Sequence, residues 1–226
     1  MNVKGLKMAH NLDTAHFNML EQQVRPSDVL NPLVLKALED IQRVQFIDKE
    51  LAGLAYADTQ LPIGYGQVIL SPIIVGRMLQ VVNVQPNENV LEIGTGTGYF
   101  TALLAKLAHH VTTVEIVPEL SDMAQQKLND LNINNVTYLI GDASKSWKLI
   151  DRVDVIVATA AFVEVPDDYL QSLKVGGRML AVVGVEQNMS VQLIRRVTER
   201  EWQTDSVFET VIPAMINAEP EIKFEF

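Results

Sequence analysis

Three glycines at alternate positions, Gly94, Gly96 and Gly98, are the first residues in the sequence whose spacing suggests chemistry. They follow an apolar run at residues 90–93, which predicts a strand, and they precede a helical pattern at residues 101–108. Residues without a Cβ atom allow a sharp turn and a close approach of the backbone to a ligand. The spacing Gly-x-Gly-x-Gly differs from the Gly-x-Gly-x-x-Gly of dinucleotide-binding folds, so we expect a ligand without a pyrophosphate.

Two carboxylates lie at the ends of the next two predicted strands: Glu115 is the last residue of the strand at residues 111–115, and Asp142 follows the strand at residues 136–140. Glu115 lies about 20 residues beyond the glycines, where an acidic side chain can accept hydrogen bonds from both hydroxyls of a ribose. Asp142 can accept a hydrogen bond from the exocyclic amine of adenine. A glycine turn or a strand-end acid alone is often only a tight connection or a helix cap. The glycine turn, Glu115 and Asp142, each at the end of a predicted strand, together predict a nucleoside site. A Rossmann dehydrogenase remains an alternative, because it shares the strand, the glycine turn and the acidic residue.

Short apolar runs alternate with helical stretches after residue 89, which is typical of βαβ units with a parallel sheet. Further strands are predicted at residues 153–158 and 178–183, and two more between residues 191 and 212. We therefore predict an α/β fold with a doubly wound, mostly parallel seven-stranded sheet and an N-terminal helical segment.

The segment before this sheet is predicted to be helical. Apolar residues at three- and four-residue spacing indicate two helices within residues 17–50, with a break at Pro26. Ser27 or Asp28 is the predicted cap of the second helix.

A loop and a third helix are predicted next. Residues 61–67 hold two glycines and a proline, which favours a shaped loop more than a regular strand. Ser71 and Pro72 suit the N-cap and the first position of the helix that follows. The expected organisation is a helical segment at residues 1–60, packed on the core, and a ligand-binding domain at residues 61–226.

Composition excludes several classes of protein. The formal net charge is −10 without a run of Lys or Arg, so we expect no nucleic acid partner. The chain has no cysteine, which excludes disulfides, a thiolate nucleophile and cysteine-based metal sites. The histidines have no metal-ligand partners at suitable spacing, so no metal is expected. No apolar window is long enough to span a membrane or to form a signal peptide, and we therefore expect a cytoplasmic protein.

Residues 89–104, together with Glu115 and Asp142, resemble the class I S-adenosylmethionine-dependent methyltransferases. The loop at residues 61–67 is similar to that of the protein-L-isoaspartate O-methyltransferase family, and the resemblance covers about residues 20–215. It implies S-adenosyl-L-methionine as the cofactor, with Glu115 at the ribose and Asp142 at the adenine. The cofactor-binding residues that it implies are Glu92, Gly94, Thr95, Gly96, Gly98, Glu115, Asp142 and Ala143.

The resemblance also implies a substrate. In that family the methyl acceptor is the α-carboxylate of an isoaspartyl residue in a damaged protein, so the implied partners are isoaspartyl-containing proteins or peptides. The loop at residues 61–67 would cover cofactor and substrate, with Ile63, Gly64 and Gln67 at the substrate. A carboxylate is already a nucleophile at neutral pH and needs no strong base. Holding the carboxylate oxygen, the methyl group and the sulfonium in line supplies much of the rate.

The sequence departs from the family where this loop continues. The usual continuation is Gly-Gln-Thr-Ile-Ser-Gln-Pro, whereas residues 66–72 read GQVILSP. Leu70 aligns with the family's serine at the acceptor site, which is the expected catalytic position. Ser71 could substitute after a small backbone shift, although capping of the next helix is the simpler interpretation. Phe162, where the family commonly has proline, would reshape the acceptor pocket. The Val68 and Leu70 changes leave two alternatives open: a different acceptor, or a cofactor-binding module without catalysis.

Overall fold

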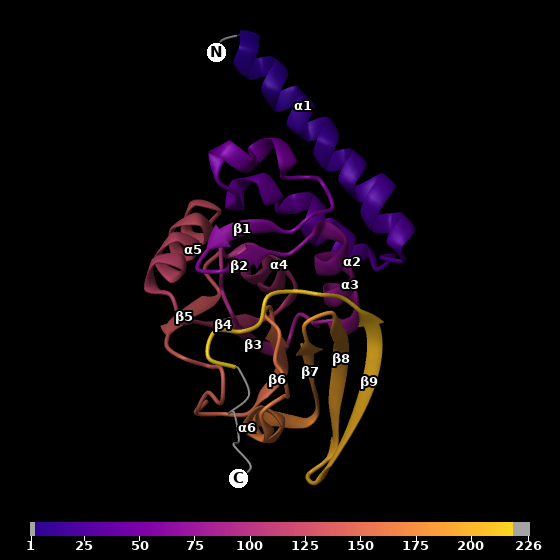
Figure 1. The fold of residues 1–226 in the computed structure, drawn as a ribbon, viewed down its shortest axis with the longest axis vertical. Coiled ribbons are helices and arrows are strands. Elements are labelled where there is room, and N and C mark those ends of the chain that lie inside the picture. The colour runs from indigo at the N-terminus through magenta and orange to yellow at the C-terminus, as the bar shows by residue number, and fades with distance from the viewer. Residues whose placement is uncertain (1–2, 219–226) are drawn as a thin grey trace.

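A seven-stranded sheet forms the centre of the computed structural model, which describes residues 3–218 (Figure 1). The strand order is β5-β4-β3-β6-β7-β8-β9. Strands from β5 to β7 run parallel, whereas β8 is antiparallel to both β7 and β9. The strands are β3 (Asn89–Ile93), β4 (His110–Glu115), β5 (Val136–Ile140), β6 (Val153–Ala158), β7 (Leu173–Val185), β8 (Asn188–Thr198) and β9 (Glu201–Glu209). The predicted mostly parallel sheet is confirmed.

The order in which strands are added to the sheet reverses after β5. The chain places β4 and β5 on one side of β3 and then returns to place β6 and β7 on the other side. The crevice at the carboxyl ends of these strands is therefore a topological switch point, which is where open α/β sheets bind ligands.

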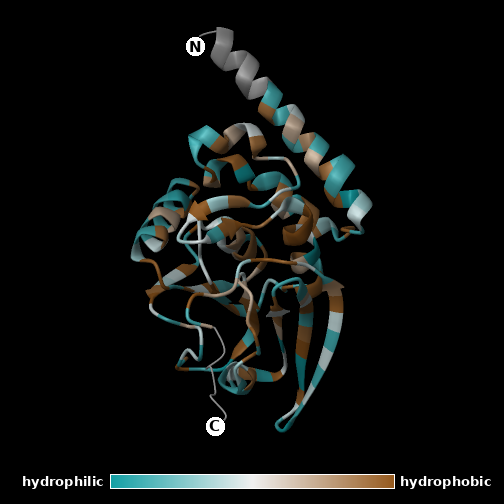
Figure 2. Ribbon diagram, viewed as in Figure 1, coloured by the Kyte–Doolittle hydropathy of each residue, from teal (hydrophilic) through white to brown (hydrophobic). Residues whose placement is uncertain are grey.

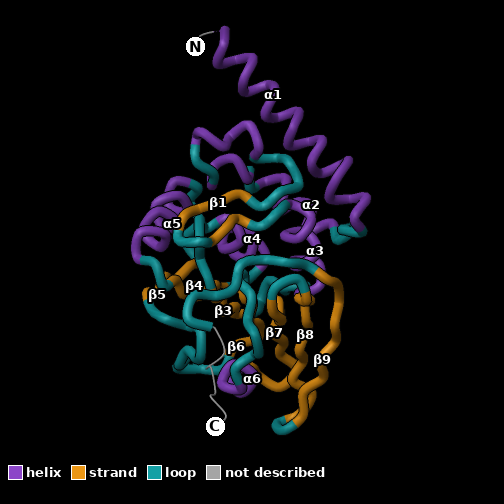
Figure 3. Tube along the Cα trace, viewed as in Figure 1, coloured by secondary structure: helices purple, strands orange, loops and turns teal. Residues whose placement is uncertain are grey.

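Most of the helices and short helical turns lie above the strands or to one side of them in Figure 3, and β9 is an open edge of the sheet. The α-helices are α1 (Val3–Met19), α2 (Pro32–Asp40), α3 (Pro72–Val82), α4 (Tyr99–Leu107), α5 (Pro118–Asp130) and α6 (Asp167–Ser172). The short turns are η1 (Leu20–Val24), η2 (Arg25–Ser27), η3 (Arg43–Phe46) and η4 (Lys49–Leu54). Within residues 3–218, no helix is both long enough and apolar enough to cross a membrane.

Hydrophobic side chains pack on both faces of the sheet. Two hydrophobic clusters are present. Val90 of β3 lies in the cluster that includes residues of α3 and α4, whereas Leu91 and Ile93 lie in the cluster that includes Tyr169 of α6. This separation follows the alternation of side chains along a strand. Figure 2 shows hydrophobic residues along the inner strands and many hydrophilic ones on α5. The two packed faces agree with a doubly wound fold.

The N-terminal segment packs on this core through α1 and the elements that follow it. The first part of α1 extends away from the body (Figure 1), and Leu12, Ala15 and Met19 of its second part pack against the core. Leu35 and Phe46 belong to the same hydrophobic cluster as the sheet-covering helices. The division of the chain at residue 60 stays a prediction.

The second predicted helix, α2, begins later than the sequence indicated. Asn31 caps it, because the Asn31 side-chain oxygen accepts the amides of Leu33 at 2.9 Å and Val34 at 3.4 Å. Asp28 instead adopts a left-handed conformation, with φ 64°, at the end of η2. The predicted cap at Ser27 or Asp28 is wrong because the chain needs further extended residues to turn from η2 into α2.

Residues 61–69 form a β-hairpin, so the prediction of a loop without regular strands is wrong. Strand β1 (Leu61–Gly64) pairs antiparallel with β2 (Gln67–Ile69), with an irregularity between Pro62 and Gly64. Tyr65 and Gly66 form the turn at φ 55° and 71°, and two consecutive positive φ values suit a tight hairpin. The glycine and proline that suggested a loop lie in a very short paired segment.

Helix α3 begins after Ser71, as predicted, but a different side chain caps it. Ser71 occupies the N-cap position and makes no side-chain capping bond. The amide of Ile73 donates instead to Oδ1 of Asp58 at 3.0 Å. The capping function predicted for Ser71 is therefore wrong, because a carboxylate from the preceding loop takes its place.

Because Asp58 and not Ser71 caps α3, substitutions of these two residues should affect stability unequally. We expect Asp58→Ala to lower the free energy of unfolding by about 1 kcal/mol, because the Ile73 amide loses its acceptor. Ser71→Ala is the matched control and should change it by less than about 0.5 kcal/mol. Urea denaturation of the two variants measures the difference, and a larger loss for Ser71→Ala would contradict this assignment.

Candidate active site

A pocket opens at the carboxyl ends of the central parallel strands. Its floor is formed by the residues that follow β3, β4, β5 and β6. The β1–β2 hairpin and residues 215 and 216 of the C-terminal segment form the opposite wall. Figure 3 shows this segment as a loop that crosses in front of the sheet below the hairpin. The pocket therefore coincides with the switch point of the sheet.

The glycine loop after β3 needs its glycines for conformation and for space. Gly94 has φ 92°, and a Cβ atom there would lie 2.6 Å from the Thr159 hydroxyl oxygen. Gly98 has φ 85°, and its Cβ would lie 2.8 Å from Leu128 and 2.9 Å from Ala124. The loop is thus packed too closely for side chains at these positions, and the Thr159 hydroxyl donates to the Gly94 carbonyl at 2.6 Å.

Glu115 links the end of β4 to the glycine loop. Its carboxylate accepts the amide of Gly96 at 2.8 Å through one oxygen and the amide of Val117 at 3.0 Å through the other. The side chain is buried but lines the pocket. Each carboxylate oxygen has a second lone pair, so Glu115 can accept two further hydrogen bonds from vicinal hydroxyls.

Asp142 lies across the pocket, after β5. Its carboxylate accepts the Ser144 amide and the Asn217 side-chain amide, both at 2.9 Å. Burial raises the pKa of Asp142, but these hydrogen bonds outweigh burial and hold the pKa below its ordinary value. Ala143 follows it on the pocket wall, and its carbonyl accepts the Tyr169 hydroxyl at 2.5 Å. A charged acceptor thus faces the pocket at a fixed position.

Glu92 lies behind the glycine loop and does not line the pocket. Its Oε2 accepts the hydroxyls of Thr101 at 2.5 Å and Thr113 at 2.7 Å, and the Thr113 hydroxyl lies 2.6 Å from that of Thr95 in the loop. The side chain is fully buried, and Oε1 has no partner among the described residues. Burial raises the pKa of Glu92 to about 8, against the effect of the two threonine hydroxyls.

The hairpin supplies the other wall. Ile63, Gln67 and Val68 line the main pocket, and Ile63 approaches the glycine loop closely, because its Cδ1 lies 3.3 Å from a Cβ built on Gly96. Gln67 also donates to the Ala214 carbonyl at 3.1 Å, which joins the hairpin to the C-terminal segment. Leu70 lies outside this pocket and lines a second pocket, which also contains Gly94 and Gly96.

Comparison with known proteins identifies the family. Residues 15–217 match the family model for Protein-L-isoaspartate(D-aspartate) O-methyltransferase (PCMT). The chain belongs to this family. Proteins named protein-L-isoaspartate O-methyltransferase from Picosynechococcus sp. and Aliivibrio fischeri (strain MJ11) are 44% and 39% identical to it over 174 and 181 residues. The matched regions cover 76% and 80% of this chain and 78% and 87% of those relatives.

Solved structures show the same fold. A putative protein-L-isoaspartate O-methyltransferase from Plasmodium falciparum, in complex with S-adenosyl-L-homocysteine, superposes with a TM-score of 0.77 at 19% identity. It is matched over 88% of this chain and 97% of its own length. A second structure, named protein-L-isoaspartate O-methyltransferase, gives a TM-score of 0.73 at 21% identity over 90% of this chain and 65% of its own.

The isoaspartyl methyltransferase fold brings most of the predicted site residues to one place. The predicted residues that line the main pocket are Ile63, Gln67, Gly94, Gly96, Glu115, Asp142 and Ala143. Thr95 and Leu70 line the adjoining second pocket. Those that line neither pocket are Gly64 in the hairpin, Ser71 before α3, Glu92 behind the loop and Gly98 at the start of α4. Their functional roles stay predictions.

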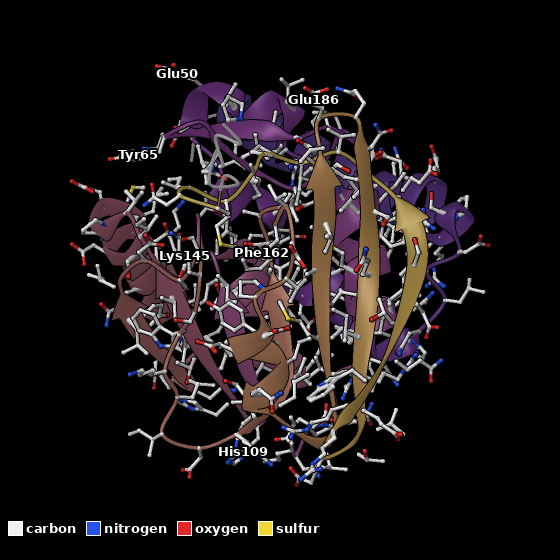
Figure 4. All side chains as sticks on the ribbon, turned by 60° about the horizontal axis from the view of Figure 1, so that its bottom comes forward. Glu50, Tyr65, His109, Lys145, Phe162 and Glu186 are labelled. Atoms are coloured by element: carbon white, nitrogen blue, oxygen red, sulfur yellow. The ribbon has the colours of Figure 1, made fainter. Side chains whose placement is uncertain are left out.

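The C-terminal wall of the pocket was not predicted from the sequence. Met215 and Ile216 line it, and Asn217 holds Asp142. These residues follow the last strand without any motif, so local spacing gave no signal for them. Phe162, expected to reshape the acceptor pocket, is instead buried against Tyr169, with ring centroids 6.0 Å apart, and lines neither the main nor the second pocket. Figure 4 labels it near the centre of the molecule, and its backbone pairs with Val183 of β7.

The buried carboxyl of Glu92 predicts a pH-dependent stability. The folded protein keeps this proton up to about pH 8, whereas the unfolded chain releases it near the ordinary value of 4.5. Unfolding therefore releases a proton between these pH values, so burial of Glu92 lowers the free energy of unfolding by up to about 1.4 kcal/mol per pH unit as pH rises. Glu92→Gln removes this contribution, and we expect the variant to gain stability relative to the native protein between pH 5 and pH 8.

Urea denaturation at several pH values measures this difference. The exposed Glu119 provides a control for the loss of one carboxylate, and Glu119→Gln should give a curve parallel to that of the native protein. Parallel curves for Glu92→Gln and the native protein would show that Glu92 is already ionised in the fold.

Proposed function

We propose that the protein is an S-adenosyl-L-methionine-dependent O-methyltransferase that esterifies the α-carboxylate of isoaspartyl residues in damaged proteins. The observation that carries this proposal is the convergence of the glycine loop, Glu115 and Asp142 on one pocket in a chain of this family. The relatives are named for the same activity, and the Plasmodium falciparum structure holds S-adenosyl-L-homocysteine, the demethylated form of that cofactor.

The pocket fits such a nucleoside. Glu115 would hold the ribose hydroxyls through the lone pairs that Gly96 and Val117 leave available. Asp142 would accept the exocyclic amine of the adenine, with Ala143 beside it. A Cβ at Gly94 would meet the Thr159 hydroxyl at 2.6 Å, so the loop is a cradle in which backbone alone can face the ligand. When bound, the cofactor supplies an electrophilic methyl group on a sulfonium.

The residues of this chain would position the reacting groups and exclude water from the pocket. The acceptor carboxylate needs no base, because it is ionised at neutral pH. Ile63, Val68 and Met215 place apolar side chains around the pocket, which strengthens electrostatic attraction inside it. The bond from Gln67 to the Ala214 carbonyl fixes the two walls relative to each other. Alignment of the reacting atoms by these walls would supply much of the acceleration.

A second candidate function follows from Leu70. This side chain is buried and apolar where the family's serine is expected, and it lines the pocket that adjoins the glycine loop. The change favours either a different methyl acceptor on the same fold and cofactor, or a cofactor-binding module without catalysis. Ser71 is nearby and makes no capping bond, so its hydroxyl remains a candidate substitute.

The partners and the location of the protein are part of this proposal. The proposed partners are isoaspartyl-containing proteins or peptides. The cytoplasmic location and the absence of a nucleic acid partner stay predictions, which cell fractionation and a salt-dependent binding assay test.

Methyl transfer to a defined peptide tests the proposal directly. We expect labelled S-adenosyl-L-methionine to methylate an isoaspartyl peptide and not its aspartyl counterpart, because only the isoaspartyl form presents a free α-carboxylate on that residue. Calorimetric titration with the cofactor, and with a nicotinamide dinucleotide as control, runs in parallel. Cofactor binding without labelling would favour the second candidate, and tight nicotinamide binding would refute both.

Restoring the serine tests the role of Leu70. We expect Leu70→Ser to raise kcat by roughly 10- to 100-fold, since a hydrogen bond to a charged group contributes about 1.5–3 kcal/mol. Leu70→Ala is the matched control, because it opens the same space without a hydroxyl. An equal effect of the two variants, in protein that still binds the cofactor, would refute the idea that the missing hydroxyl limits turnover.

A further inference from the structure

Arg43 is a fully buried cation held by backbone carbonyls. Its guanidinium donates to the carbonyls of Ala55 at 2.6 Å, Thr59 at 3.1 Å and Leu70 at 3.0 Å. The side chain is 0% exposed, and within residues 3–218 it forms no ion pair. These bonds connect η3, the loop before β1 and the end of β2.

Burial of this charge does not by itself favour the folded state. A charge moved from water into a protein interior pays a desolvation penalty that neutral carbonyls repay only in part. Burial lowers the pKa of Arg43, and the nearby Tyr99 and Asp58 oppose that shift. Nε of Arg43 and the hydroxyl of Tyr99 are both buried without a partner among the described residues. Apolar side chains would stabilise this region without that penalty. The guanidinium therefore has a different role, which is to hold the backbone segments that it binds in place.

The groups around Arg43 belong to both sides of the proposed reaction centre. Leu70, whose carbonyl it binds, ends the hairpin and lines the second pocket. Tyr99 lines the same pocket and begins α4 directly after the glycine loop. Phe46, three residues from Arg43 in η3, packs on the Tyr99 ring with centroids 5.4 Å apart. The short helix η3 therefore contacts Leu70, at the end of the hairpin, and Tyr99, directly after the glycine loop.

We propose that Arg43 is a positioning residue for methyl transfer, whose guanidinium fixes the end of β2 at a set distance from the glycine loop. The inference rests on the proposed function, since the wall that it fixes is the one at which the acceptor carboxylate would lie. None of the residues whose carbonyls it binds lines the main pocket. Loss of Arg43 should therefore affect turnover more than cofactor affinity.

Arg196 provides a matched control elsewhere in the fold. It is 1% exposed, and its guanidinium donates to the carbonyls of Gln171 at 2.9 Å and Leu173 at 2.7 Å. Unlike Arg43, it also forms an ion pair with Glu199, at 3.0 Å. Neither of these residues, nor Arg196 itself, lines the main or the second pocket. Replacing either arginine by lysine removes a buried fork of donors that binds backbone carbonyls.

The experiment compares Arg43→Lys with Arg196→Lys in the full chain. We expect a lower melting temperature for both variants, a roughly 10- to 100-fold lower kcat only for Arg43→Lys, and dissociation constants for S-adenosyl-L-homocysteine within about threefold of the native value for both. Equal kcat losses in the two variants, or an unchanged kcat in Arg43→Lys, would overturn the proposal.

Hydrogen–deuterium exchange gives a readout that does not depend on activity. We expect faster exchange at residues 61–70 in Arg43→Lys and unchanged exchange there in Arg196→Lys. If the native protein does not methylate an isoaspartyl peptide, the proposed function fails, while this measurement still decides whether Arg43 fixes the hairpin. Exchange at residues 61–70 that is the same in all three proteins would overturn the positioning role. Arg43→Met provides a second variant, which removes every donor and should increase the exchange further.

Discussion

The hydrogen bond from the Gly96 amide to the Glu115 carboxylate joins the two strand ends on which the pocket depends. It ties the turn after β3 to the end of β4, and the same carboxylate also fixes the Val117 amide at the start of α5. The hydroxyl of Thr95, next to Gly96, hydrogen-bonds to that of Thr113, which in turn donates to the Glu92 carboxyl group. The ligand-facing backbone is therefore preorganised by groups on two neighbouring strands.

Local patterns were sufficient to predict the parts of the site that come from one strand and its following turn. The glycine loop, Glu115 and Asp142 each follow an apolar run, and a parallel sheet brings such ends together whatever lies between them. Glu92 shows the limit of this reasoning. It is close to the glycines in sequence, but the alternation along β3 turns its side chain toward Thr101 of α4, so it supports the loop from behind.

Other features required knowledge of contacts between distant segments. The cap of α3 comes from Asp58 and not from the adjacent Ser71, and the partner of Asp142 is Asn217. Neither pairing leaves a trace in spacing or composition. The hairpin at β1 and β2 was missed because glycine and proline are common to loops and to tight strand reversals, and only its pairing distinguishes them.

The C-terminal wall of the pocket has a consequence for synthesis. Met215 and Ile216 complete the pocket, and the carbonyl of Ala214 receives the bond from Gln67 in the hairpin. Because a chain is made from its N-terminus, the sheet, the glycine loop and both carboxylates exist before this wall does. The polar groups of the site are therefore made before the residues that enclose them, and the enclosed site can form only after residue 216 has emerged from the ribosome.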